Sequence, residues 1–257
     1  MPTNDDELNG GESPTGRTIG SHEQAPDTMS GAGAWRARGV AFVFAAGLLV
    51  VGRLRYLSLH SEDPPAAAAY ATLIYIGLTV IAAVLLIRSG APLRRLGFTR
   101  VERPWFNLAL VLVGVLVLQL SSSFLTPLWE QLFGSGRDLE RFADVAGSRE
   151  ALIKLLALNW TVAAFGEELA FRIVLMRGIA YALGDTRKAV AIAFIVQAII
   201  FGLVHAYQGP AGIAGTTISA LVFGGLTLVA RWSIWPAAIA HGLNNTIGII
   251  EIYNVGP

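Results

Sequence analysis

The chain has 257 residues, of which 54% are hydrophobic and only 14% are charged, and its net charge is +1. Soluble domains carry about 25% charged residues, so this composition, with its apolar residues in long blocks, excludes an ordinary soluble protein and indicates a polytopic membrane protein. The near-zero net charge gives no reason to expect a nucleic-acid partner, and the lack of cysteine in the sequence excludes disulfides, thiol nucleophiles and cysteine-ligated zinc.

The first 34 residues are polar and rich in Gly, Ser, Thr, Asp and Glu, with almost no apolar clusters. A segment of this kind buries too little apolar surface to fold, so we expect residues 1–34 to form a disordered tail. The segment also lacks the basic stretch followed by an apolar core that is typical of a signal peptide.

Long apolar segments follow this tail. A helix needs about 20 apolar residues to cross the hydrocarbon of a bilayer, and seven segments reach or approach that length. We therefore expect an all-α polytopic membrane protein, a bundle of about seven transmembrane helices (six to eight). The expected spans are residues 35–56, 66–87, 105–125, 151–183, 189–206, 213–230 and 236–252.

We expect the protein in the cell (inner or plasma) membrane. The Lys and Arg residues of its loops favour a cytoplasmic N-terminus. Most of them lie before the first expected span or follow the second, fourth and sixth, which is one face of the membrane if there are seven spans. Five arginines lie on the opposite face and count against this orientation: Arg53, Arg55, Arg137, Arg141 and Arg149.

Ionisable and amide side chains inside the expected spans are few and clustered. The main group lies in the fourth span, at the end of the fifth and in the seventh, as Glu167, Glu168, Arg172, His205, His241, Asn244 and Asn245, with Glu251 near the end of the seventh. The first three spans have no acidic residue in their apolar centres, only milder groups such as Gln119. A charged side chain at the centre of a bilayer costs about 2.5–3.5 kcal/mol even on insertion scales, so such residues mark a functional site by default.

Helical spacing separates the two adjacent glutamates of the fourth span. Glu168 and Arg172 are four residues apart, share one helix face and are expected to form an ion pair. Glu167 points about 100° away from Glu168. We therefore expect Arg172 to neutralise Glu168 and Glu167 to face the interior of the bundle.

The histidines are expected near the same place. His205 lies about as many residues from the turn between the fourth and fifth spans as Glu167 does, so the two side chains should reach similar depths. Phe201 precedes His205 by four residues and should pack beside it. His241 and Asn245 share a face of the seventh span, but the sequence leaves open whether that face reaches the others.

Two chemistries suit these residue types. A carboxylate and an imidazole around a water molecule can act by general-base catalysis, with a second imidazole and an amide as donors to an oxyanion. Alternatively, Glu167, His205 and His241 can bind a zinc ion that keeps an open position for water. A transporter or a non-catalytic membrane protein could use the same cluster, although the sequence has no inverted repeat with paired broken helices.

Three motifs, each in a separate expected span, resemble one family. "EELAFR" (Glu167–Arg172), "FGLVH" (Phe201–His205) and "HGLNN" (His241–Asn245) resemble the EExxxR, FxxxH and HxxxN signature of the CAAX-protease and bacteriocin-processing family. Members are also called CPBP intramembrane metalloproteases or abortive-infection-like proteins. Each motif alone is weak, whereas three in this order are a strong signal.

The resemblance implies a helical fold with a conical catalytic chamber in the membrane and a membrane-associated peptide or protein as substrate. It divides the chain into N-terminal helices and loops (35–149) and a catalytic core (150–253). Glu167 would activate water with His205, while His241 and Asn245 would stabilise the oxyanion. Three further residues would support the site: Glu168, Arg172 and Phe201. The resemblance leaves both zinc and a metal-independent glutamate mechanism open, and the composition is typical of a bacterial chain.

Overall fold

The computed structural model describes residues 31–59, 64–91, 97–98 and 103–257. Every regular element in these ranges is helical. Most of the expected disordered tail lies outside the described residues, but its last four residues, from Gly31 onward, belong to the first helix.

The N-terminal part forms three long helices. They are α1 (Gly31–Ser58), α2 (Pro64–Arg88) and α3 (Pro104–Phe133). A short 3₁₀ helix, η1 (Glu140–Val145), lies in the polar connection that follows. The fourth segment is divided into α4 (Arg149–Leu158), η2 (Asn159–Glu167), η3 (Leu169–Met176) and α5 (Arg177–Ala182). The last helices are α6 (Arg187–Val204), η4 (Ala206–Gln208), α7 (Gly209–Val229) and α8 (Trp235–Val255).

Each of the seven expected spans corresponds to one of these helical segments. By length and hydropathy, however, only five described helices could cross a membrane, namely α1, α2, α3, α6 and the continuous η4–α7. The fourth segment is not one uninterrupted α-helix, and the polar side chains of α8 lower its mean hydropathy. The structure thus supports a multi-pass helical protein but does not confirm a count of seven.

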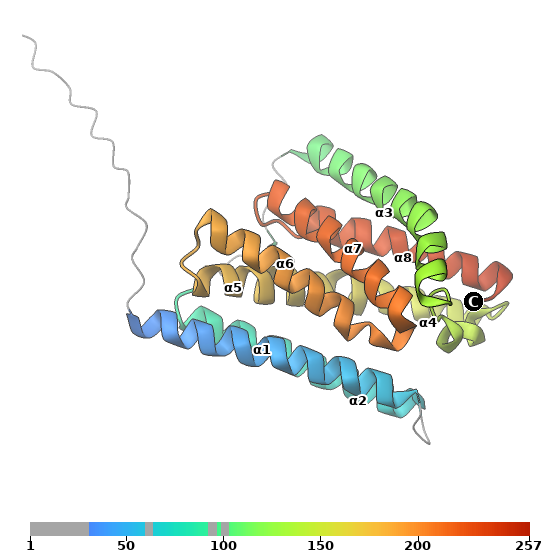
Figure 1. The fold of residues 1–257 in the computed structure, drawn as a ribbon, viewed down its shortest axis with the longest axis horizontal. Coiled ribbons are helices and arrows are strands. Elements are labelled where there is room, and N and C mark those ends of the chain that lie inside the picture. The colour runs from blue at the N-terminus through green and yellow to red at the C-terminus, as the bar shows by residue number, and fades with distance from the viewer. Residues whose placement is uncertain (1–30, 60–63, 92–96, 99–102) are drawn as a thin grey trace, which may run out of the picture.

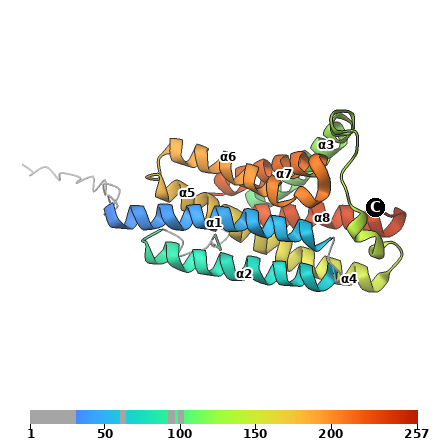
Figure 2. The same ribbon diagram turned by 60° about the horizontal axis from the view of Figure 1, so that its bottom comes forward.

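The helices form a bundle with two sides (Figure 1). α1 and α2 run side by side in opposite directions along one edge, and α3 lies on the opposite edge against α7 and α8. The fourth segment and α6 lie between these two sides, and the turned view in Figure 2 shows α1 passing over them. The motif-bearing segments therefore occupy the middle of the bundle.

The buried apolar residues form three clusters, and two of them include the N-terminal helices. The larger of these two joins α1 and α2 to η3 and α6, and the smaller joins α3 to α7 and α8. α1 lies close to the end of α6 at Gly52, where an added Cβ would lie 2.7 Å from the Cα of Val204. This close approach brings the last turn of α1 to the region where α6 ends at His205.

Candidate active site

The two glutamates lie in an unusual part of the fourth segment. η2 ends at Glu167 and η3 begins at Leu169, and both are π-helical, with Glu168 between them. π-helical turns are rare and occur often at functional sites. The apolar pattern of the sequence predicted one helix over residues 151–183 and gave no indication of this change in winding.

Glu168 uses both carboxylate oxygens inside the protein. Its Oε2 lies 3.0 Å from Nε of Arg172, and its Oε1 lies 2.8 Å from Nδ1 of His241. The ion pair predicted from the four-residue spacing is therefore present, with both side chains fully buried. The contact also shows that the His241 face of α8 reaches the fourth segment, which the sequence left open.

Aromatic rings enclose the buried guanidinium of Arg172. Its Cζ lies 4.8 Å from the ring centroid of Phe201 and 5.3 Å from that of Phe223, on α7. Nη2 donates to the carbonyl oxygen of Ala220 at 3.4 Å. Phe223 also stacks on His241, with centroids 4.5 Å apart. Sequence reasoning missed Phe223 because a phenylalanine in an apolar span looks like any core residue.

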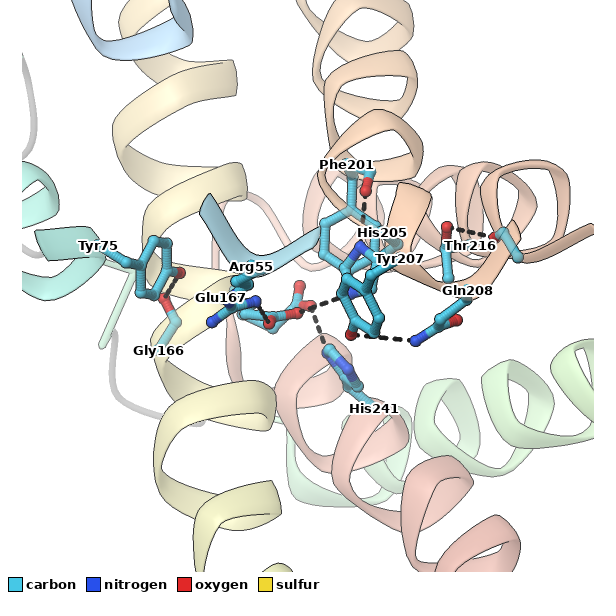
Figure 3. A network of polar contacts seen from close by, with 12 residues as sticks. Arg55, Tyr75, Gly166, Glu167, Phe201, His205, Tyr207, Gln208, Thr216 and His241 are labelled. Atoms are coloured by element: carbon cyan, nitrogen blue, oxygen red, sulfur yellow. Dashed lines mark hydrogen bonds and ion pairs between the residues drawn. The ribbon is translucent and has the colours of Figure 1, made fainter. Parts of the chain in front are cut away.

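Glu167 is buried, and two charged or titratable side chains lie near its carboxylate without closing to hydrogen-bond length. Its Oε1 lies 3.6 Å from Nη1 of Arg55 and its Oε2 lies 3.9 Å from Nε2 of His205, as Figure 3 shows. Both distances exceed the length of a direct hydrogen bond. The expected proximity of Glu167 and His205 is confirmed.

Each histidine uses Nδ1 in a hydrogen bond, and among the described residues its Nε2 makes none. Nδ1 of His205 lies 2.7 Å from the carbonyl oxygen of Phe201, which can only accept, so Nδ1 carries the proton. In the neutral ring, Nε2 then presents a lone pair toward Glu167. His241 donates from Nδ1 to Glu168 in the same way, and its Nε2 has no hydrogen-bond partner in the described part of the chain. The predicted packing of Phe201 beside His205 is present, with ring centroids 4.6 Å apart.

Two residues from the N-terminal helices complete the surroundings of Glu167, and sequence reasoning missed both. In the sequence, Arg55 was only a charge that counted against a cytoplasmic N-terminus. In the structure, its side chain is 15% exposed and faces Glu167. Tyr75 donates its hydroxyl to the carbonyl oxygen of Gly166 at 3.0 Å. The cavity beside these groups leaves about 10 Å³ for the centres of water molecules, which is room for about one.

Asn244 and Asn245 of α8 make no hydrogen bond to the glutamates or histidines among the described residues. Asn244 accepts a hydrogen bond from Gln119 on α3, with 2.9 Å between Oδ1 and Nε2. Asn245 is half-buried one turn after His241, and its amide has no hydrogen-bond partner in the part of the chain that the structure describes. Its predicted role at the oxyanion stays a prediction.

The residues of the expected zinc site do not form a ligand set as they stand. Glu167, His205 and His241 come into one region, but no group of three His, Asp or Glu side chains among the described residues is arranged to hold a metal ion. The carboxylate of Glu167 faces the guanidinium of Arg55, and a metal ion bound there would meet a like charge. The donor set therefore does not fit a zinc ion in this arrangement.

Comparison with known families gives one match. Residues 149–247 match the family model described as "Type II CAAX prenyl endopeptidase Rce1-like". The matched segment contains all three motifs, so the resemblance to the CAAX-protease and bacteriocin-processing family is confirmed for this part of the chain. The match supports a peptidase, and α1, α2 and α3 lie outside it. No curated protein and no solved structure matches the chain.

Proposed function

We propose that this chain is an intramembrane endopeptidase that hydrolyses a peptide bond of a membrane-associated protein or peptide, with Glu167 as the general base. In this proposal the protein is embedded in the lipid bilayer and binds its substrate there. The family match over residues 149–247 supports the reaction class, and the residue roles rest on the geometry of the buried cluster.

The observation that carries the proposal is the contrast between the two glutamates. Glu168 has both oxygens within 3.0 Å of a partner, which suits a residue that holds the structure. Glu167 has its partners at 3.6 and 3.9 Å, so its oxygens are available to a water molecule. A general base must lie within hydrogen-bond reach of the proton that it removes, directly or through one water.

The chemistry follows from these positions. A water molecule between Glu167 and His205 donates one proton toward the carboxylate and the other toward Nε2 of the imidazole. As its oxygen attacks the peptide carbonyl carbon, Glu167 takes up the proton. The tetrahedral intermediate then collapses, the C–N bond breaks, and the proton passes from Glu167 to the leaving amine.

The groups of α8 supply the donors for the oxyanion. Asn245 lies one turn from His241, and its amide N–H has no hydrogen-bond partner among the residues that the structure describes. Because Nδ1 of His241 already donates to Glu168, Nε2 becomes a donor only in the doubly protonated ring, and the carboxylate of Glu168 stabilises that charge. Donors of this kind are worth about 10²–10³ in rate. Because the donor set does not fit a metal ion, no step passes through one.

The test is cleavage of a membrane-tethered peptide by the purified full chain. We expect Glu167→Gln to lower kcat about 10²- to 10⁴-fold, since it removes the base. Glu251→Gln, at an exposed glutamate near the end of α8, is the matched control and should cleave like wild type. Equal cleavage by Glu167→Gln would reject the assignment. Solute flux in liposomes without cleavage of any peptide would favour a transporter.

A further inference from the structure

We infer that Arg55 and Tyr75, which α1 and α2 contribute, are positioning residues for Glu167. The inference rests on the proposed function, because it assigns how the general base is held. Both residues lie outside the segment that matches the family model, so neither the motifs nor the match identifies them. They act through Glu167 and need not touch the substrate.

The burial of Arg55 is the first observation. An arginine in the last turn of an apolar helix normally extends its guanidinium to the membrane surface. Arg53, two residues earlier, is exposed and lies over the ring of Tyr56. The side chain of Arg55 is only 15% exposed and turns inward to Glu167. Burying a guanidinium is costly unless it is paired, and the carboxylate is its acidic partner.

The contacts of Tyr75 are the second observation. Its hydroxyl donates to the carbonyl oxygen of Gly166, the residue before Glu167. Its ring also lies beneath the guanidinium of Arg55, with 5.5 Å between Cζ and the ring centroid. One buried side chain therefore contacts both the backbone that carries Glu167 and the cation that faces its carboxylate.

Together these contacts fix the direction of the base. Arg55 holds the Oε1 side of Glu167, which leaves Oε2 facing His205. Tyr75 holds the backbone at the end of η2, where a π-helical stretch gives way to Glu168. A displacement of about 1 Å in a reacting group can cost about 10² in rate, so a loosened carboxylate should slow turnover without weakening substrate binding.

The experiment measures kcat and KM of the full chain with Arg55→Ala, Arg55→Lys, Tyr75→Phe and the control Arg53→Ala. We expect Arg55→Ala to lower kcat about 10- to 100-fold and to leave KM within about two-fold. Arg55→Lys should recover part of the loss, and guanidinium ions at non-denaturing concentration should rescue Arg55→Ala but not Glu167→Gln. Tyr75→Phe loses one neutral hydrogen bond, so its kcat should fall about 2- to 10-fold.

The outcomes separate this inference from the proposed function. If Glu167→Gln is inactive while Arg55→Ala turns over like Arg53→Ala, the positioning role is wrong and the base assignment stands. If Arg55→Ala does not fold, Tyr75→Phe decides, because a wild-type kcat in that variant overturns the inference. A wild-type chain that cleaves no peptide overturns the proposed function, and the positioning role with it.

Discussion

At the scale of single residues, the buried charge of Arg172 is the costliest feature of the cluster. The guanidinium is fully buried between two phenylalanine rings, and Glu168 is the carboxylate that pairs with it. Removing one partner of such a pair leaves an uncompensated charge and destabilises a protein by about 3–5 kcal/mol. The pair is therefore essential to stability whether or not it takes part in catalysis.

We expect Glu168→Gln to lower the thermal unfolding temperature of the detergent-solubilised protein markedly, because it leaves Arg172 buried without its counter-charge. Glu251→Gln, at an exposed glutamate, should unfold close to wild type. Circular dichroism during heating checks both variants. Equal unfolding temperatures for the two would show that Arg172 finds another partner or water.

A second prediction at this scale concerns the metal. Because Glu167 faces Arg55 and the donor set does not fit zinc, we expect purified active protein to contain far less than one zinc per chain and to keep its activity with a chelator. Elemental analysis and the cleavage assay measure these two quantities. Activity that is lost to the chelator and restored by zinc would mean that Arg55 moves aside when the site is loaded.

The sequence predicted residue contacts only where they are local or carried by a motif. The Glu168–Arg172 pair follows from spacing along one helix, and the similar depths of Glu167 and His205 follow from counting residues from a shared turn. Arg55 could not be placed, because its contact with Glu167 joins segments more than 100 residues apart and depends on how α1 packs.

At the scale of elements, the contact between α1 and α6 positions Arg55. An added Cβ at Gly52 would lie 2.7 Å from the backbone of Val204, so α1 can approach α6 this closely only because residue 52 has no side chain. Gly52 precedes Arg55 by less than one helical turn. Any side chain at this position must therefore push the end of α1 away from the site.

We expect Gly52→Ala to lower kcat about 10-fold or more and to destabilise the protein by about 1–3 kcal/mol, as overpacking does. Gly39→Ala is the matched control on the same helix, since its Cβ would meet nothing within 4 Å and alanine favours a helix interior. Cleavage and thermal unfolding of both variants test the contact. Wild-type kcat in Gly52→Ala would show that Arg55 keeps its place without the close approach.

Hydropathy was sufficient to place the helices but not to describe their winding. Each expected span overlaps one helical segment because long apolar runs are distinctive, although only five of the described helices could cross a membrane by length and hydropathy. The π-helical turns of η2 and η3 were not predicted, because the same apolar residues fit either winding and tertiary contacts decide between them. The change occurs at the two glutamates, where the sequence offered only their spacing.

At the scale of the whole molecule, the number of crossings determines which loops share a side of the membrane. With seven crossings, the exposed residues Ser135 and Lys188 lie on opposite sides. If only the five long apolar helices cross, the fourth segment does not, and the two residues lie on the same side. The proposed site needs the fourth segment inside the bundle, so we expect seven.

The lack of native cysteine makes this topology directly measurable. In right-side-out vesicles, we expect Ser135→Cys to react with a membrane-impermeant maleimide and Lys188→Cys to react only after permeabilisation. This pattern also requires the cytoplasmic N-terminus that the loop charges predict. Reaction of both cysteines in intact vesicles would support five crossings, and the reverse pattern would invert the orientation.

The order of the charged partners along the chain has a consequence for biogenesis. Chains are synthesised from the N-terminus at about 5–20 residues per second, so the fourth segment reaches the insertion machinery before α6, α7 and α8 exist. Glu168 is followed one turn later in the same segment by Arg172, its partner in an ion pair. Arg55, which faces Glu167, has been synthesised earlier, in α1. Each carboxylate can thus enter the bilayer beside a positive charge, before the histidines of the later helices are made.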